Sequence, residues 1–409
     1  MTAAEKPSPR PQFLALPPEL REEIYRLILS PDANRIAQPD KYSDYDFHDA
    51  IKLFKLNKQI YFESRKVWRD LNIFVRIETP FERAQQHVAL EGHTPILVKG
   101  RRARLFNDHL MSVKIGAPFS GEYEHEIYEF VILLEDLEKF VKTWYYADLS
   151  QPELNSYLSL TLTLRDPHTP EREEKRIPRW LQRRLLLPFG MVKHLQQLEI
   201  AGDPKPLPSI ETELREEIKK PHLSAEHCLR ETARLKIEGN TALGKGQYHD
   251  ALHLYTQAWE AMHIVVAGRQ RHIHADAFFG RELREPPYTG KNGQAERLVL
   301  RVQLVANTCL AYLKLKDYDE AIFWGMRTIN MIREAMGVDE GAEIPPEDEA
   351  VLGFPAAEQM GKIYYRTAVA YKEQEDKDTA RRLLRVARVY LPRDPIVSKE
   401  LAACALRIG

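Results

Sequence analysis

The chain has 409 residues, enough for two or three domains that each bury a core. Its 59 Lys and Arg residues balance 60 Asp and Glu residues, and a net charge of −1 excludes the strongly basic composition expected of a nucleic-acid binder. The three cysteines are too few and too scattered for a disulfide framework or a zinc site, which favours a reducing compartment: Cys228, Cys309 and Cys404. The opening MTAAEKPSPRPQ lacks the apolar core of a secretory signal, and the sequence has no run of 18 apolar residues. We therefore expect a soluble cytoplasmic protein, with the nucleus as the alternative location.

Two helices are expected near the start of the chain. LPPELREEIYRLIL (16–29) has a proline at an early helical position and apolar residues at helical spacing at Leu20, Ile24, Leu27 and Ile28. KLFKLNKQIYFESRKVW (52–68) repeats this pattern. Both segments therefore predict amphipathic helices.

The rest of the first half has the character of a sheet. Five segments show alternation or short apolar runs bounded by polar residues and glycine, as strands do: 72–78, 110–116, 128–134, 157–166 and 195–202. Together with the two helices, they predict an α+β domain over 12–202.

The residue composition changes at DPKPLPSI, where three prolines in eight residues interrupt any strand or helix. We place a linker at 203–224 and a second domain at 225–409. Nearly every long segment of that second domain has the 3.6-residue period of a helix, which predicts an all-α fold.

The second domain contains an internal repeat. Three segments align on a 34-residue helix–turn–helix template, with first positions at Thr232, Val302 and Gly361. Template position 20, where two helices cross closely and need a small residue, is alanine in all three repeats: Ala251, Ala321 and Ala380. The intervals exceed the template length, which predicts insertions near 267–296 and 337–356. The segment 394–408 predicts a final helix that caps the array.

Five polar residues lie on the first helices of these repeats: Lys236, Asn240, Asn307, Lys362 and Arg366. Residues four apart on a helix share a face, so Lys236 lies beside Asn240 and Lys362 beside Arg366. Three cations and two amides converging from three helices would provide a positive potential and directed hydrogen-bond donors. The pattern predicts a binding site for a carboxylate group.

The repeat pattern resembles that of tetratricopeptide (TPR) domains, and the five residues resemble the carboxylate clamp of TPR co-chaperones, over about residues 225–408. In that family a Lys and an Asn of the first helix, an Asn of the second and a Lys and an Arg of the third grip the C-terminal EEVD peptide of heat-shock protein 90 or heat-shock protein 70. The resemblance implies that Lys236, Asn240, Asn307, Lys362 and Arg366 do the same. It implies a co-chaperone-like adaptor rather than an enzyme, with no cofactor.

Residues 12–80 resemble fungal F-box-like proteins, through FLALPPELREEIYRLIL and KLNKQIYFESRKVW. This resemblance implies docking on the adaptor subunit of a cullin ubiquitin ligase, and hence a substrate receptor as the alternative function. The spacing between the two helices is longer than in an F-box, and the usual cysteine before Trp68 is missing. The competing interpretation is that these two helices cap the mixed sheet.

Three other segments contain residue types that could form a site. HIHAD (272–276) offers two histidines and Asp276 but no separate ligand group, so a solvated loop is favoured over a metal site. The acidic run EYEHEIYE (122–129) has no nucleophile placed beside it. The basic segment REEKRIPRWLQRR (172–184) is interpreted as a solvated helix face with Trp180 buried. No catalytic or metal-binding residues are therefore expected.

Overall fold

The computed structural model describes residues 12–36, 44–118, 126–339 and 341–404. The chain divides into two compact units. The first comprises residues 1–222 together with 267–272, and the second comprises 223–266 together with 273–409. The first unit combines a mixed sheet with helices, whereas the second is largely helical.

The first unit is built on a six-stranded sheet with the order β4-β6-β3-β5-β7-β8. β3 runs parallel to β5, and β7 parallel to β8, while the other neighbours are antiparallel. The strands are β3 (Phe74–Thr79), β4 (Val98–Lys99), β5 (His109–Gly116), β6 (Tyr128–Leu133), β7 (Ser159–Arg165) and β8 (Gln197–Asp203). All five strands expected from the sequence are confirmed, and β4 adds a short edge.

The alternation of the strands divides the buried residues between two faces of the sheet. In β3, Val75 and Ile77 join the main core, whereas Phe74 joins a smaller cluster with Val131 and Leu133 of β6. The main core is completed by three helices, α6 (Leu137–Ser150), α7 (Arg179–Leu186) and α8 (Pro208–Lys219). The smaller cluster includes Ala103 of the short helix α5 (Arg101–Arg104).

Two expectations for this unit are wrong. The segment 203–224 was expected to be a linker, but it contains α8, whose Ile210 and Leu214 are fully buried in the main core. The division between the units lies instead between His222 and Leu223. Trp180 was expected to be buried, yet it is 56% exposed, because α7 directs Leu181 and Leu185 toward the sheet.

The two helices near the start form a small core of their own. α1 (Pro18–Leu29), η2 (Ala50–Lys55) and α3 (Lys58–Leu71) pack through Tyr25, Leu29, Ile60 and Val67. Trp68 at the end of α3 also contacts Phe74 at the start of the sheet, with ring centroids 6.1 Å apart. The helix pair therefore has its own small core and contacts the sheet through Trp68.

The buried face of α1 is not the apolar face that its sequence suggested. Arg21, Tyr25 and Leu29 are the buried residues of the helix, while Leu20, Leu27 and Ile28 are exposed. Arg21 is accommodated by two hydrogen bonds to Glu63 of α3, of 2.9 Å and 2.7 Å. Paired charges thus replace apolar packing at this position.

The remaining elements of the first unit are short. They are η1 (Gln12–Ala15), α2 (Pro31–Asn34), β1 (Arg35–Ile36), β2 (Asp44–Tyr45), α4 (Ala84–Leu90), η3 (Leu134–Asp136), η4 (Leu154–Tyr157) and η5 (Leu187–Met191).

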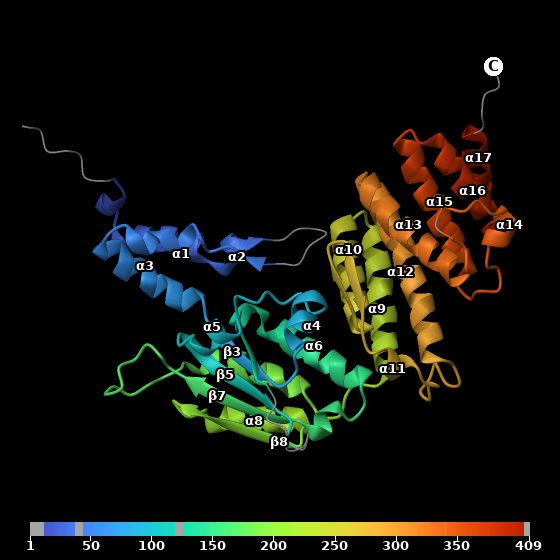
Figure 1. The fold of residues 1–409 in the computed structure, drawn as a ribbon. Helices are drawn as coiled ribbons and strands as arrows, with labels where there is room; N and C mark the ends of the chain where they lie inside the picture. Colours follow the sequence, from blue (N-terminus) through green and yellow to red (C-terminus); the bar gives the residue numbers. More distant parts are fainter. Residues whose placement is uncertain (1–11, 37–43, 119–125, 340, 405–409) are drawn as a thin grey trace, which may run out of the picture. The chain divides into compact units, whose positions relative to one another are not determined.

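The second unit contains three helical hairpins, each joined by a loop of two or three residues (Figure 1). They are α9 (Ala225–Gly244) with α10 (Tyr248–Ala261), α12 (Gly293–Leu315) with α13 (Tyr318–Ala335), and α15 (Ala357–Glu373) with α16 (Lys377–Tyr390), followed by α17 (Pro395–Ala403). α12 contacts both α9 and α15, so the hairpins stack in chain order. α12 is the one described helix with the length and hydropathy of a membrane span, and its central packing accounts for this composition.

Small residues allow the helices to approach closely. Ala251, Ala321 and Ala380, on the second helices of the three hairpins, are fully buried. A side chain at Gly239 would overlap the Tyr255 ring, which lies on the second helix of the same hairpin. A side chain at Gly325 of α13 would overlap Thr367 of α15, so the close contact also occurs between hairpins.

The two inserted segments are folded. The first contains β9 (Ile264–Ala267), β10 (Gln270–Ile273) and α11 (Asp276–Phe279). Arg297, which is fully buried, binds the carboxylate of Asp276 at 2.9 Å and the carbonyl of Met262 at 3.0 Å. The second insertion contains α14 (Pro346–Glu349), whose Glu349 accepts a 2.8 Å bond from Tyr364. Asp276 of the HIHAD segment therefore forms an ion pair with Arg297.

Candidate carboxylate-binding site

The five residues singled out in the sequence all lie on the first helices of the three hairpins. Lys236 and Asn240 are on α9, Asn307 is on α12, and Lys362 and Arg366 are on α15. α12 packs between the other two helices, and its residues can therefore interact with both.

The two asparagines bond to each other. The Oδ1 of Asn240 accepts hydrogen bonds from the Nδ2 of Asn307 at 2.7 Å and from the hydroxyl of Tyr255 at 2.9 Å. Two donors on one oxygen fix the orientation of the Asn240 amide. Its amino group has no acceptor among the described residues and lies on an exposed side chain. Asn240 therefore presents an oriented hydrogen-bond donor to a ligand.

Lys236 is a half-buried cation with a neutral partner. Its ammonium donates to the side-chain carbonyl of Gln303, which lies one turn before Asn307 on α12. Burial lowers the pKa of Lys236, because the charged form has lost part of its hydration. No carboxylate pairs with Lys236 in the part of the chain that the structure describes.

Arg366, on α15, is likewise a desolvated cation with a neutral hydrogen-bond partner. Its guanidinium donates to the backbone carbonyl of Ala306, the residue before Asn307. Burial lowers the pKa of Arg366 and raises that of the nearby Tyr255 to about 12. Among the described residues, Arg366 has no carboxylate partner either.

Lys362 differs from the other two cations because its partner is a carboxylate. Its ammonium forms a 2.6 Å ion pair with Glu358, one turn earlier on α15. The two side chains are 40% and 65% exposed, so this pair lies in water. Spacing places Lys362 on the same side of α15 as Arg366, but no bond connects it to the other four residues.

The structure thus links four of the five expected residues through bonds to α12 and leaves the fifth paired locally. Three participants were not identified from the sequence as members of the site: Gln303, Glu358 and the Tyr255 hydroxyl. Gln303 could have been found from its position four residues before Asn307 on the same helix.

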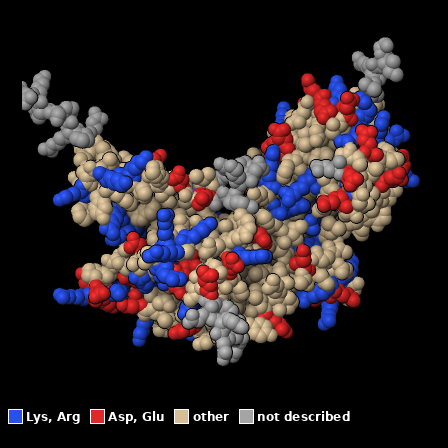
Figure 2. Space-filling model, in the orientation of Figure 1, with Lys and Arg blue, Asp and Glu red and all other residues tan. Residues whose placement is uncertain are grey.

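The cysteines on the first helices of the first two hairpins are not activated thiols. The two thiols of the inner helices are buried, and burial raises the pKa of Cys228 to about 11 and that of Cys309 to about 12. Neither is an activated nucleophile. Figure 2 shows acidic and basic side chains interspersed over most of the visible surface, with a group of Lys and Arg side chains on the helical unit. Oriented amides and desolvated cations are suited to hold an anion.

Comparison with known proteins places the chain in no family. It matches no protein-family model. It also has no significant sequence match among curated proteins.

Proposed function

We propose that the helical unit is a TPR carboxylate clamp and that the protein is an adaptor for the C-terminal EEVD peptide of heat-shock protein 90 or heat-shock protein 70. The clamp residues are Lys236, Asn240, Asn307, Lys362 and Arg366. The terminal carboxylates of the peptide are the bound groups.

One observation carries this proposal. Lys236 and Arg366, on opposite sides of α12, are partly desolvated cations whose acceptors are neutral carbonyl groups. Removing a charge from water without an opposite charge is unfavourable, and an incoming carboxylate would offset that cost. When such a ligand binds, Lys236 and Arg366 would donate to charged carboxylate oxygens instead of neutral carbonyl oxygens.

The expected affinity follows from the number of charged contacts. A hydrogen bond to a charged group contributes about 1.5–3 kcal/mol. A few such bonds, less the cost of ordering a peptide, are compatible with micromolar binding, or about 8 kcal/mol. The affinity should fall with ionic strength, because screening weakens attraction between charges near the surface.

Calorimetry on the full chain with a peptide ending in EEVD tests the proposal. We expect saturable binding that is lost when the C-terminus of the peptide is amidated, because amidation removes one carboxylate. Arg366→Ala should weaken binding about 10- to 150-fold, the equivalent of one charged hydrogen bond. Lys377→Ala removes an exposed lysine from the second helix of the third hairpin and should leave the affinity unchanged. Equal binding of the acid and amide peptides would refute the clamp.

A second candidate function is supported by the exposed face of α1. Leu20 and Leu27, seven residues apart and therefore on one face, are 47% and 69% exposed. An exposed apolar face on an F-box-like helix supports a receptor that docks on the adaptor subunit of a cullin ubiquitin ligase. Co-purification of that adaptor subunit should be lost when Leu20 and Leu27 are both replaced by Asp. An adaptor interaction that survives this double substitution would exclude this surface.

A further inference from the structure

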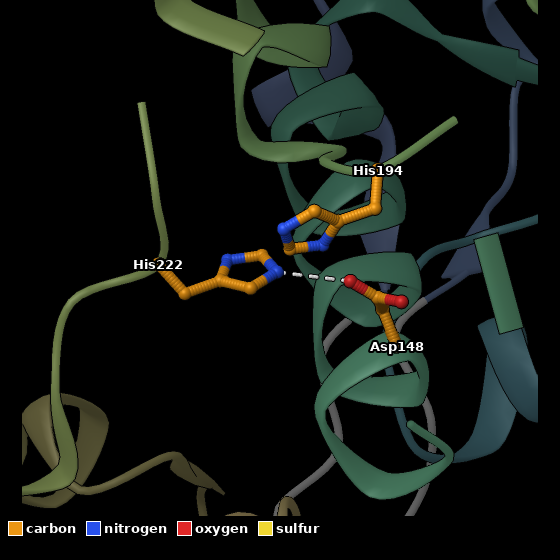
Figure 3. Close-up of side chains that lie close together, drawn as sticks. All are labelled: Asp148, His194 and His222. Carbon is orange, nitrogen blue, oxygen red and sulfur yellow. Dashed lines mark hydrogen bonds and ion pairs between the residues drawn. The ribbon is translucent and has the colours of Figure 1, made fainter. Parts of the chain in front are cut away.

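Three residues with metal-binding side chains meet in the first unit, far from one another in sequence. Asp148 lies near the end of α6, His194 in the turn before β8, and His222 after α8. One ligand atom from each lies within 4.8 Å of the other two. Figure 3 shows the three side chains pointing toward one another from separate segments.

We infer that Asp148, His194 and His222 form a binding site for a divalent transition-metal ion of the Zn²⁺ type. Two imidazole nitrogens and one carboxylate oxygen form a ligand set typical of such ions. Three protein ligands leave a further coordination position for water, and the exposure of His194 allows water to reach it.

An Asp–His ion pair alone does not account for the cluster. The Nε2 of His222 lies 2.9 Å from the Oδ2 of Asp148, which uses one atom of each side chain. His194 adds a second imidazole at the same place, with its ring centroid 5.3 Å from that of His222. The ring of His194 has no hydrogen-bond partner among the described residues, and its backbone adopts a left-handed conformation, with φ of 57°. This conformation is uncommon outside glycine.

A series of buried and part-buried hydrogen bonds holds the three segments together. The indole of Trp144, one turn before Asp148, donates to Asn155 at 2.8 Å, and the Asn155 amide donates to the carbonyl of Lys193 at 2.9 Å. The Lys193 ammonium in turn donates to the carbonyl of Glu217, in the last turn of α8. α6, the turn that carries His194, and the end of α8 are thereby connected. Such support is what a metal site needs in order to orient its ligands.

Binding requires a small rearrangement. Tetrahedral Zn²⁺ with bonds of about 2.0–2.2 Å separates its ligand atoms by roughly 3.3 Å. Asp148 and His222 would move apart slightly, and the metal would take the place of the hydrogen bond between them, with the imidazole proton of His222 carried on Nδ1. His222 is the last residue of the 1–222 segment of the first unit, and the ion would connect this end of the segment to α6.

The test uses the full chain without an affinity tag, stripped of metal with a chelator. We expect one equivalent of Zn²⁺ to bind in calorimetry, and Co²⁺ to give the visible absorption bands of a tetrahedral site. At a hundredfold excess over Kd, Zn²⁺ should raise the unfolding midpoint of the first unit by about 5–10 °C.

Two variants probe the ligands with little effect on the fold. His194→Asn keeps a residue that tolerates positive φ, and His222→Gln keeps a donor for Asp148. Each should weaken Zn²⁺ binding by at least about 100-fold, as for loss of a group that orients or ligates the ion. His227→Ala removes an exposed histidine outside the cluster and serves as the control. Absence of stoichiometric binding, or an affinity that is the same in all three variants, would overturn the inference.

Discussion

The ion pair between Lys362 and Glu358 makes a specific prediction about the clamp. In the proposed complex, Lys362 binds a peptide carboxylate and must leave Glu358. The pair is exposed, and exposed ion pairs contribute about 0.2–1 kcal/mol. Replacing Glu358 by Gln removes this competitor and should tighten binding of the EEVD peptide by about 1.4- to 5-fold.

The assay is competition against a labelled EEVD peptide, measured in wild type, Glu358→Gln, Lys362→Ala and the double variant. The gain from Glu358→Gln should vanish when Lys362 is already alanine, because the two effects pass through one side chain. Glu373→Gln changes the net charge equally, roughly 22 Å further along α15, and should have little effect. Weaker binding by Glu358→Gln, or the same gain in the Lys362→Ala background, would contradict a role for Lys362 in gripping the peptide.

Two further predictions concern stability. Gly325→Ala should destabilise the helical unit by about 1–3 kcal/mol in urea unfolding, because the new Cβ would overlap the Thr367 hydroxyl and lie 3.0 Å from its Cβ; Gly244→Ala, which has open space around its Cβ, should not destabilise it. The two hydrogen bonds from Arg21 lower the pKa of Glu63 to about 2 from its usual 4.5, so the pair contributes stability above pH 4.5 that is lost as the pH falls toward 2. The thermal midpoint should therefore decline more steeply with acid in wild type than in Glu63→Gln, and parallel declines would show that the pair does not stabilise the fold.

Elements with a strong local pattern were predictable. β7 alternates leucine with polar residues, and its Leu160, Leu162 and Leu164 are fully buried as that pattern indicates. The helices of the second unit follow a 3.6-residue apolar period. In both cases the information lies within a few residues of the chain, because side-chain direction depends on the backbone geometry of the element itself.

Local pattern was insufficient where the choice of buried face depended on distant partners. α1 buries Arg21 because Glu63 of α3 is available to pair with it. α8 belongs to the first unit because the sheet core receives Ile210 and Leu214, although three prolines precede or open that helix. Neither partner is visible from the segment alone.

Local sequence pattern was sufficient to predict the periodic elements, the mixed character of the first half, the helical character of the second, and the five polar positions on three helices. The contacts of Lys236 with Gln303 and of Lys362 with Glu358, and the meeting of Asp148, His194 and His222, became apparent only from the folded chain. Periodicity depends on neighbours along the backbone, whereas these contacts depend on how segments that are distant in sequence pack together.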